Sequence, residues 1–454
     1  METAFTTGRD RYIPLSVFWA VQVSFVEDSM VSNTNGEIPH EGEQSKTSLR
    51  PLLLIQLWNR LEELFISSRI PFLLLGVLIS VALAKLLLIA FLNWMILEDL
   101  IPFLYFNPYN PPDMSGTPEL LLALANRWDS THFLEIARNG YPSGVESDLL
   151  FAFAPVYPLM ISIVGQALGD LYLAGVVVSN TFYFLSIIAI YKVARIYMEY
   201  KESCLIALVF GLFPTYLTYG TLAYSEAPFL FFAIASWYFF KKEQYLPCAV
   251  FTTFSILTRY ISGLLFLIYG VIILSNLIDK YKQEKSMLKA FDFRLLWFII
   301  PVASVIAFFL YLQSLTGSFF AAFDAHAWFG DTLSTPYHQF VWFFEGYFTE
   351  INPGVEPILL MLLRYMFTIP FFFLTLLLLK DNVELGIYGV LFMWITLSME
   401  GISGIASPRI MLSAWVAFLA FKSRISSGIY IVISVMFFFV GLWVMYQFQL
   451  TFFA

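Results

Sequence analysis

The first long apolar run decides the fold: residues 70–97 read IPFLLLGVLISVALAKLLLIAFLNWMIL. About 20 apolar residues in a helix cross the ~30 Å hydrocarbon core of a bilayer, so this stretch is long enough to span a membrane. Ten further apolar runs follow, at residues 171–190, 204–221, 227–240, 245–257, 261–277, 293–315, 358–379, 385–399, 410–421 and 429–444. The pattern predicts an all-α polytopic membrane protein with about eleven transmembrane helices.

The composition agrees with a membrane protein and excludes a soluble enzyme. Of the 454 residues, 59% are hydrophobic and 13% charged, whereas soluble domains are about 25% charged. The net charge of −8 argues against a nucleic-acid partner. The two cysteines, Cys204 and Cys248, lie in apolar segments and offer neither a disulfide framework nor a zinc spacing.

The N-terminal region differs from the rest of the chain. Residues 13–26 follow Arg9 and Arg11 and superficially resemble a signal peptide, but no small-residue cleavage site follows them. Residues 27–49 are rich in Glu, Ser, Asn and Gly, which is typical of a disordered linker. We therefore expect a partly disordered tail over residues 1–49 and one membrane domain over residues 50–454.

Basic residues orient the spans, because positively charged loops are retained on the cytoplasmic side. Every second connection is basic, which places the N-terminus in the cytoplasm. The two long connections on the opposite side, residues 98–170 and 316–356, carry charges of −7 and −5. Together they exceed the net charge of the whole chain, so we expect two acidic extracytoplasmic loops. Counting the apolar residues 151–168 as a span would invert every later loop, and we expect this stretch to be re-entrant or interfacial.

Three short stretches in the first of these loops form a motif. Residues 126–133 read NRWDSTHF, residues 136–141 read IARNGY and residues 151–158 read FAFAPVYP. This block resembles GPI mannosyltransferase II, the phosphatidylinositol-glycan class V family of the GT-C glycosyltransferases. Weaker similarities follow at Tyr224-Ser225-Glu226, at residues 258–263 (TRYISG) and at Pro408-Arg409.

The resemblance implies a GT-C-like fold and an inverting glycosyltransferase. Such an enzyme moves mannose from dolichyl (polyprenyl) phosphate mannose to a lipid-linked glycan. In a eukaryote the acceptor would be a GPI precursor carrying one mannose, extended through an α-1,6 link in the endoplasmic reticulum. In a prokaryote another acceptor at the plasma membrane would be expected. A small membrane subunit is a further partner that the resemblance allows. Residues 260–262 depart from the family pattern and leave the acceptor open.

The residues themselves indicate how such a reaction could proceed. A sugar on a lipid phosphate is already activated, so one carboxylate suffices to take the proton from the acceptor hydroxyl. Asp129 is our candidate for that base, and we expect the charge of neighbouring Arg127 to keep it ionised. The alternative is that Arg127 and Asp129 merely pair with neighbours at the start of a helix, with Asp129 as its cap.

Cationic side chains would bind the leaving phosphate, because the arginine fork suits phosphate oxygens. Arg127, Arg259 and Arg409 are the candidates, with snorkelling to the interface as the alternative for the two at span ends. His132 lies one helical turn after Asp129 and could bind donor or acceptor, unless it is structural. Glu226 could bind sugar hydroxyls, act as a second acid, or be a solvated loop acid.

In the second acidic loop, Asp324, His326, Asp331 and His338 alternate with aromatic residues. Such groups could bind a metal, but no tight ligand spacing occurs. Packing at the membrane surface with partial acceptor binding is the favoured interpretation. We expect no cofactor, and metal dependence stays open. A transporter or flippase of lipid-linked substrates is the alternative function. It is disfavoured because no matching halves with Gly or Pro breaks are visible.

Overall fold

The computed structural model describes residues 12–13, 72–101, 116–145, 148–326, 334–336, 357–399, 406–422 and 424–450. The predicted tail over residues 1–49 lies almost entirely outside these ranges. Its two described residues form strand β1 (Tyr12–Ile13), which pairs antiparallel with β2 (Tyr141–Pro142). The remaining regular structure in the described ranges is helical. The predicted all-α polytopic class is therefore confirmed.

Helices occupy each of the apolar runs that the sequence marks. Five are both long and apolar enough to cross a membrane: α3 (Phe72–Leu97), α7 (Leu171–Tyr197), η2 with α12 (Tyr260–Ser262, Gly263–Glu284), η3 with α14 (Phe293–Phe298, Ile299–Thr316) and α22 (Ser427–Leu450). The others are α10 (Glu226–Lys241), α11 (Tyr245–Ile256), α18 (Pro357–Asp381), α19 (Val383–Ser398) and α21 with η5 (Ser407–Ile410, Met411–Phe421). The total of about eleven spans stays a prediction.

One predicted run is not continuous. Residues 204–221 divide into α8 (Tyr200–Gly211) and α9 (Pro214–Tyr219). Pro214 lacks an amide hydrogen and its ring clashes with the preceding turn, so a helix that reaches it from the N-terminal side ends there and a new one begins. The expectation of one continuous helix over 204–221 is therefore wrong. The short helix α9 packs against α22, deep in the bundle.

The centre of the bundle is α10, which packs against α7 and α11. Fourteen of its sixteen residues are buried, including Trp237, because its sequence has apolar side chains on every face. A helix that is apolar all round is expected in the interior of a membrane domain. Its first residue, Glu226, carries a charge, unlike the apolar residues that follow it, and it is buried as well.

The connection 98–170 contains helices α4 (Glu119–Ala125), α5 (Asp129–Asn139), η1 (Leu149–Ala152) and α6 (Val156–Leu168). The 13 residues of α6 extend about 20 Å at 1.5 Å per residue, which is too short to cross the hydrocarbon core. Its buried side packs against α7. Because α11 is shorter still and is among the predicted spans, helix length does not decide the matter, and the re-entrant or interfacial placement of residues 151–168 stays a prediction.

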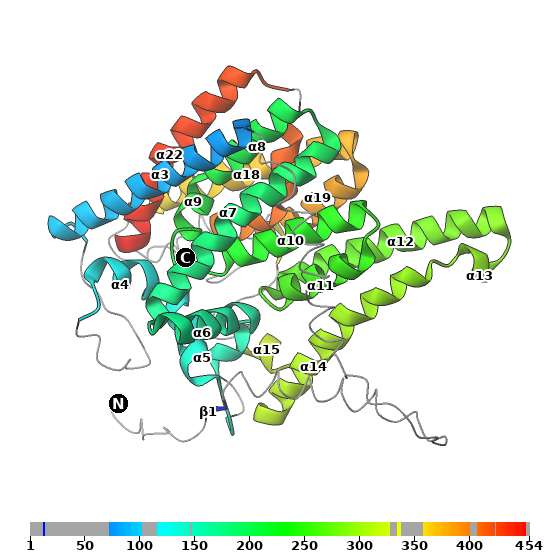
Figure 1. Cartoon of the computed structure of the whole chain (residues 1–454), viewed down its shortest axis with the longest axis horizontal. Helices are drawn as coiled ribbons and strands as arrows, with labels where there is room; N and C mark the ends of the chain where they lie inside the picture. Colours follow the sequence, from blue (N-terminus) through cyan, green and yellow to red (C-terminus); the bar gives the residue numbers. More distant parts are fainter. Residues whose placement is uncertain are drawn as a thin grey trace, which may run out of the picture.

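The two acidic connections meet in space. Helix α15 (Ala321–Asp324), from the second of them, packs against η1 of the first. Gly144 N also donates to Leu315 O at 3.0 Å. Figure 1 shows α5, α6, α15 and one end of α14 gathered together, with α13 (Met287–Ala290) at the far end of the α12 and α14 pair. The lysine-rich α12–α13 turn is thus remote from the acidic connections, as the charge pattern predicts.

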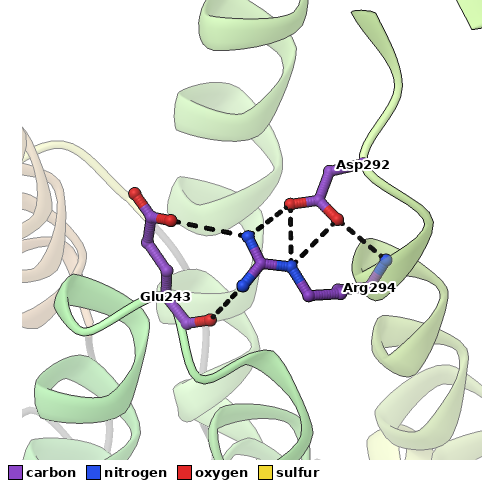
Figure 2. Close-up of polar contacts among 3 residues, drawn as sticks. All are labelled: Glu243, Asp292 and Arg294. Atoms are coloured by element: carbon purple, nitrogen blue, oxygen red, sulfur yellow. Dashed lines mark hydrogen bonds and ion pairs between the residues drawn. The ribbon is translucent and has the colours of Figure 1, made fainter. Parts of the chain in front are cut away.

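A polar contact joins two connections at the α13 end of that pair (Figure 2). Arg294 Nη2 lies 2.8 Å from Asp292 Oδ2 and 3.5 Å from Glu243 Oε2, so the start of η3 is tied to the turn after α10. The arginine and Glu243 are exposed, and such pairs contribute about 0–1 kcal/mol.

Candidate active site

Four of the predicted site residues form one cluster of alternating charge. Arg409 Nη1, in α21, donates to Asp129 Oδ2 at 2.6 Å. Arg409 Nε lies 3.2 Å from Glu226 Oε1. Arg259 Nη1, which follows α11, donates to the same oxygen of Glu226. Segments separated by up to 280 residues thus converge on two carboxylates and two guanidinium groups.

The cluster is withdrawn from solvent. The side chains of Glu226 and Arg409 are 2% and 9% exposed, and those of Asp129 and Arg259 are 16% and 18% exposed. The interpretation of Glu226 as a solvated loop acid is therefore wrong. Snorkelling of Arg409 is also excluded, because its guanidinium is turned toward two carboxylates in the interior. Asp129 and Arg259 form the more accessible sides of the cluster.

Both acids begin a helix, Asp129 in α5 and Glu226 in α10. Negative charge is favoured at this end of a helix, since the unpaired backbone amides and the macrodipole are positive there. Asp129 is the first residue of α5, and no side chain caps the helix. Capping by Asp129 is thus wrong, whereas the expected pairing at a helix start is present, with Arg409 as the partner of Asp129.

The residue before Asp129 has an unusual backbone. Trp128 has φ 52° and ψ −128°, a left-handed conformation that is rare for a bulky side chain. Such strain costs on the order of 1–3 kcal/mol and persists only where neighbours hold it. Trp128 Nε1 donates to Phe448 O at 3.3 Å, and Thr131 Oγ1 donates to Trp128 O at 2.8 Å. The end of α22 therefore helps to hold the turn that presents Asp129.

Arg127 has a different role from the one expected. Its Nη1 donates to Gln449 O, one of the carbonyls at the C-terminal end of α22. A cation is favoured at that end of a helix. The cation that pairs with Asp129 is Arg409, so the expectation that Arg127 keeps Asp129 ionised is wrong. Arg127 instead fastens the strained turn to α22, and its assignment to phosphate stays a prediction.

The electrostatics of the cluster favour an ionised Asp129. Burial raises the pKa of Asp129, whereas the charges of Arg409 and His132, the hydrogen bond from Arg409 and the charge of Arg259 lower it. The net effect is a pKa below the ordinary aspartate value. Asp129 is therefore a carboxylate at neutral pH and can accept a proton.

His132 is buried beside Asp129. Its ring lies 4.8 Å from that of Phe153, between centroids. Burial lowers the pKa of His132 to about 4, and the nearby charge of Asp129 only partly opposes this effect. His132 is thus a neutral imidazole at physiological pH. Placement next to Asp129 agrees with its choice as a candidate, while a contact with substrate stays a prediction.

The low pKa gives a test of His132. Since the imidazole is already neutral above about pH 4, no change in its charge occurs between pH 5.5 and 7.5. We expect transfer rates in this range to show no limb near pH 6.5, and His132→Gln to have a profile of the same shape. Rate measurements across this range with both proteins check the prediction. An acidic limb near pH 6 that the glutamine variant lacks would contradict it.

Two tyrosines that the sequence analysis did not assign complete the cluster. The ring centroids of Tyr219 and Tyr224 lie 5.6 and 5.5 Å from Arg409 Cζ, within the range of cation–π attraction. Tyr224 belongs to a motif that was noted, but Tyr219 was missed. The available signal was Arg409 itself, since a cation in an apolar run requires aromatic or acidic neighbours.

Glu226 joins the two arginines, and its removal tests that role. We expect Glu226→Gln to destabilise the protein by about 3 kcal/mol, because it leaves Arg259 without its carboxylate and Arg409 with Asp129 alone. Thermal unfolding in detergent measures the effect. The matched control is Glu384→Gln, whose carboxylate lies 2.7 Å from Lys241 Nζ but is 35% exposed. Its loss should change stability by less than about 1 kcal/mol. Equal shifts for the two variants would contradict the assignment.

The second acidic connection is described only in part. Asp324 lies at the end of α15 and accepts a hydrogen bond from Ser318 Oγ at 3.0 Å. Asp331 and His338 lie outside the described residues. Within the described ranges, no three His, Cys, Asp or Glu side chains group as metal ligands. Metal dependence therefore stays an open question, and the acceptor-binding role of this loop stays a prediction.

Comparison with known proteins adds the family. A family model described as Mannosyltransferase (PIG-V) matches residues 61–318, more than half of the chain. The matched range includes Asp129, Glu226 and Arg259. Arg409 lies outside this range, and the tertiary structure brings it into contact with Asp129. A search of curated proteins finds no match.

Proposed function

The chain belongs to the PIG-V mannosyltransferase family, and from this premise we propose that it takes mannose from dolichyl-phosphate mannose, or a related polyprenyl carrier. The protein is an integral membrane glycosyltransferase, and a transporter is the weaker alternative. The observation that carries the proposal is the buried cluster of Asp129, Arg409, Glu226 and Arg259. It combines a base with two arginines of the kind that bind phosphate.

The proposed reaction is a single inverting displacement. The acceptor hydroxyl attacks the anomeric carbon of mannose while Asp129 takes the hydroxyl proton. The bond between that carbon and the phosphate oxygen breaks on the opposite face. The polyprenyl phosphate leaves with the bonding electron pair, and the configuration at the anomeric carbon is inverted.

The charges of the cluster suit this displacement. The donor is a phosphodiester with one negative charge, and the leaving lipid phosphate is a monoester that gains a second. Asp129 loses its charge in the same step, since it takes a proton. One negative charge thus moves from Asp129 to the phosphate. Arg409 Nη1 lies 2.6 Å from Asp129 Oδ2. If the phosphate binds beside Arg409, this arginine can stabilise the negative charge both on Asp129 and on the phosphate. Arg259, the more exposed arginine, is the second phosphate ligand that we propose.

Family membership and the cluster support a lipid-linked glycan as acceptor, and we propose a GPI precursor carrying one mannose. Glu226 Oε2 is buried and accepts no hydrogen bond from the described residues. An oxygen in that situation is suited to accept a bond from a substrate hydroxyl. The site belongs to the face of the acidic connections, so the proposed location is the luminal side of the endoplasmic reticulum in a eukaryote. The corresponding prokaryotic location is the outer face of the plasma membrane.

The proposed donor and acceptor can be tested together. Membranes that contain the protein are supplied with labelled dolichyl-phosphate mannose and a panel of lipid-linked glycans. We expect labelled product with the precursor that carries one mannose, in an α-1,6 link. Transfer from a nucleotide-linked mannose after depletion of dolichyl phosphate would refute the donor. Transfer to a different glycan would refute the acceptor and leave the donor intact.

A further inference from the structure

A buried lysine in the first span has no place in the reaction described so far. Lys85 lies near the middle of α3 (Phe72–Leu97), and 3% of it is exposed. About 18 Å of helix separates it from either end, too far for its side chain to reach the interface. A charge in the middle of a span is costly and is often functional. Its retention therefore requires an explanation.

The partners of Lys85 are a backbone carbonyl and an aromatic ring. Lys85 Nζ donates to Gly220 O at 2.7 Å and lies 3.6 Å from the ring centroid of Tyr183. Within the described part of the chain, no carboxylate lies within ion-pair distance of it. Gly220 follows the last residue of α9 (Pro214–Tyr219), so the amino group of Lys85 binds the carbonyl end of a helix.

Tyr183 fixes the same point from the other side. A Cβ atom added at Gly220 would lie 2.1 Å from Cδ2 of Tyr183, so only glycine allows the ring to lie this close to the turn. The ring is thus in contact with both the ammonium group of Lys85 and the backbone at Gly220. The end of α9 cannot shift without disturbing this contact or the hydrogen bond from Lys85.

The segment held in this way carries part of the site. Tyr219 immediately precedes Gly220, and Tyr224 and Glu226 follow within six residues. These three side chains surround Arg409, with two rings about 5.5 Å from its Cζ and one carboxylate oxygen 3.2 Å from its Nε. Asn180 Nδ2 donates to Thr221 O at 3.1 Å, and Ser179 Oγ donates to Tyr224 O at 2.8 Å. The hydrogen bond from Lys85 to Gly220 O precedes these two along the turn.

We propose that Lys85 is a positioning residue for mannosyl transfer: by binding the carbonyl end of α9, it holds the turn of residues 219–226 so that Arg409 is aligned for the donor phosphate. The inference rests on the proposed function of Arg409. It explains why a lysine lies where an apolar residue of equal length would avoid the desolvation penalty. Lys85 touches no substrate and acts only through the turn.

The test compares Lys85→Met with Lys85→Arg, and Lys192→Met in α7 is the matched control. We expect Lys85→Met to raise the KM for dolichyl-phosphate mannose about tenfold, the effect of losing one buried hydrogen bond. The KM for the acceptor should change less than twofold. Amide hydrogen exchange in the peptide of residues 217–226 should become at least about fivefold faster, with little change elsewhere. Lys85→Arg should recover most of the donor affinity, and the control should match the wild type.

Each result decides the inference. Unchanged exchange in residues 217–226 overturns it, because the turn then does not depend on Lys85. A lower thermal midpoint with a normal donor KM in the folded fraction also overturns it, since Lys85 would then be only structural. If the wild type transfers no mannose from the dolichyl donor, the proposed donor fails. The exchange measurement still tests whether Lys85 holds the turn.

Discussion

Asp129→Asn should transfer mannose at about a thousandth of the wild-type rate, within the range expected for loss of a general base. The amide has the shape of the carboxylate. Its oxygen can still accept the hydrogen bond from Arg409 Nη1, which in the wild type lies 2.6 Å from Asp129 Oδ2. It cannot take the proton of the acceptor hydroxyl. The variant should therefore remain inserted in the membrane and bind the donor. The measurement is the initial rate with purified dolichyl-phosphate mannose at saturating acceptor.

The matched control is Asp292→Asn, which changes the same group in the exposed cluster of Figure 2. Asp292 Oδ2 lies 2.8 Å from Arg294 Nη2, so this variant also alters an aspartate–arginine pair but far from α5. It should keep the wild-type rate. A normal rate for Asp129→Asn with purified donor would remove Asp129 from the chemistry, whatever the control shows.

The pH dependence of the wild type adds a second measurement for Asp129. The acidic limb of kcat/KM reports the free enzyme. Since Arg409 holds the pKa of Asp129 below its ordinary value, the base stays ionised as the pH falls. Activity should therefore be retained to a lower pH than an unperturbed aspartate would allow, and it should be lost only when Asp129 is protonated.

Much of the fold could be predicted because each membrane helix corresponds to one continuous apolar run of the sequence. The run at residues 70–97 contains its own helix, α3, and hydropathy alone finds it. The two acidic connections could be placed on one face by counting charges, and α15 indeed packs against η1. The division at Pro214 was readable from a single residue. Hydropathy averages across it, however, and predicts one continuous helix over residues 204–221.

The sequence predicted which charged residues belong to the site, but not which arginine pairs with which carboxylate. Asp129, Glu226, Arg259 and Arg409 each stand out as charges beside apolar segments, and the fold brings all four together. Which arginine faces which acid depends on tertiary structure. Arg127 is closest in sequence to Asp129, yet the strained backbone of Trp128 and the end of α22 direct it elsewhere. No local pattern reports a partner 280 residues away.

Substitution of Arg409 should have the second-largest effect. Arg409→Met removes the one side chain that reaches both carboxylates, and it leaves Asp129 without its partner and Glu226 with only Arg259. Breaking a buried pair costs about 3–5 kcal/mol, and the donor phosphate loses a proposed ligand as well. We expect kcat/KM for the donor to fall about 10²- to 10³-fold, with lower thermal stability. The control is Arg424→Met, since Arg424 pairs with Asp381 at 2.7 Å but is about a third exposed.

The pH profile separates this role of Arg409 from simple loss of structure. Burial raises the pKa of Asp129, and Arg409 is the main group that opposes it. Without Arg409 the pKa rises, so the acidic limb of kcat/KM should move to higher pH in Arg409→Met. Arg409→Lys restores the charge but not the planar fork. It should move the limb back toward the wild-type position while recovering only part of the donor affinity. A limb that stays in place in the methionine variant would show that Arg409 does not control Asp129.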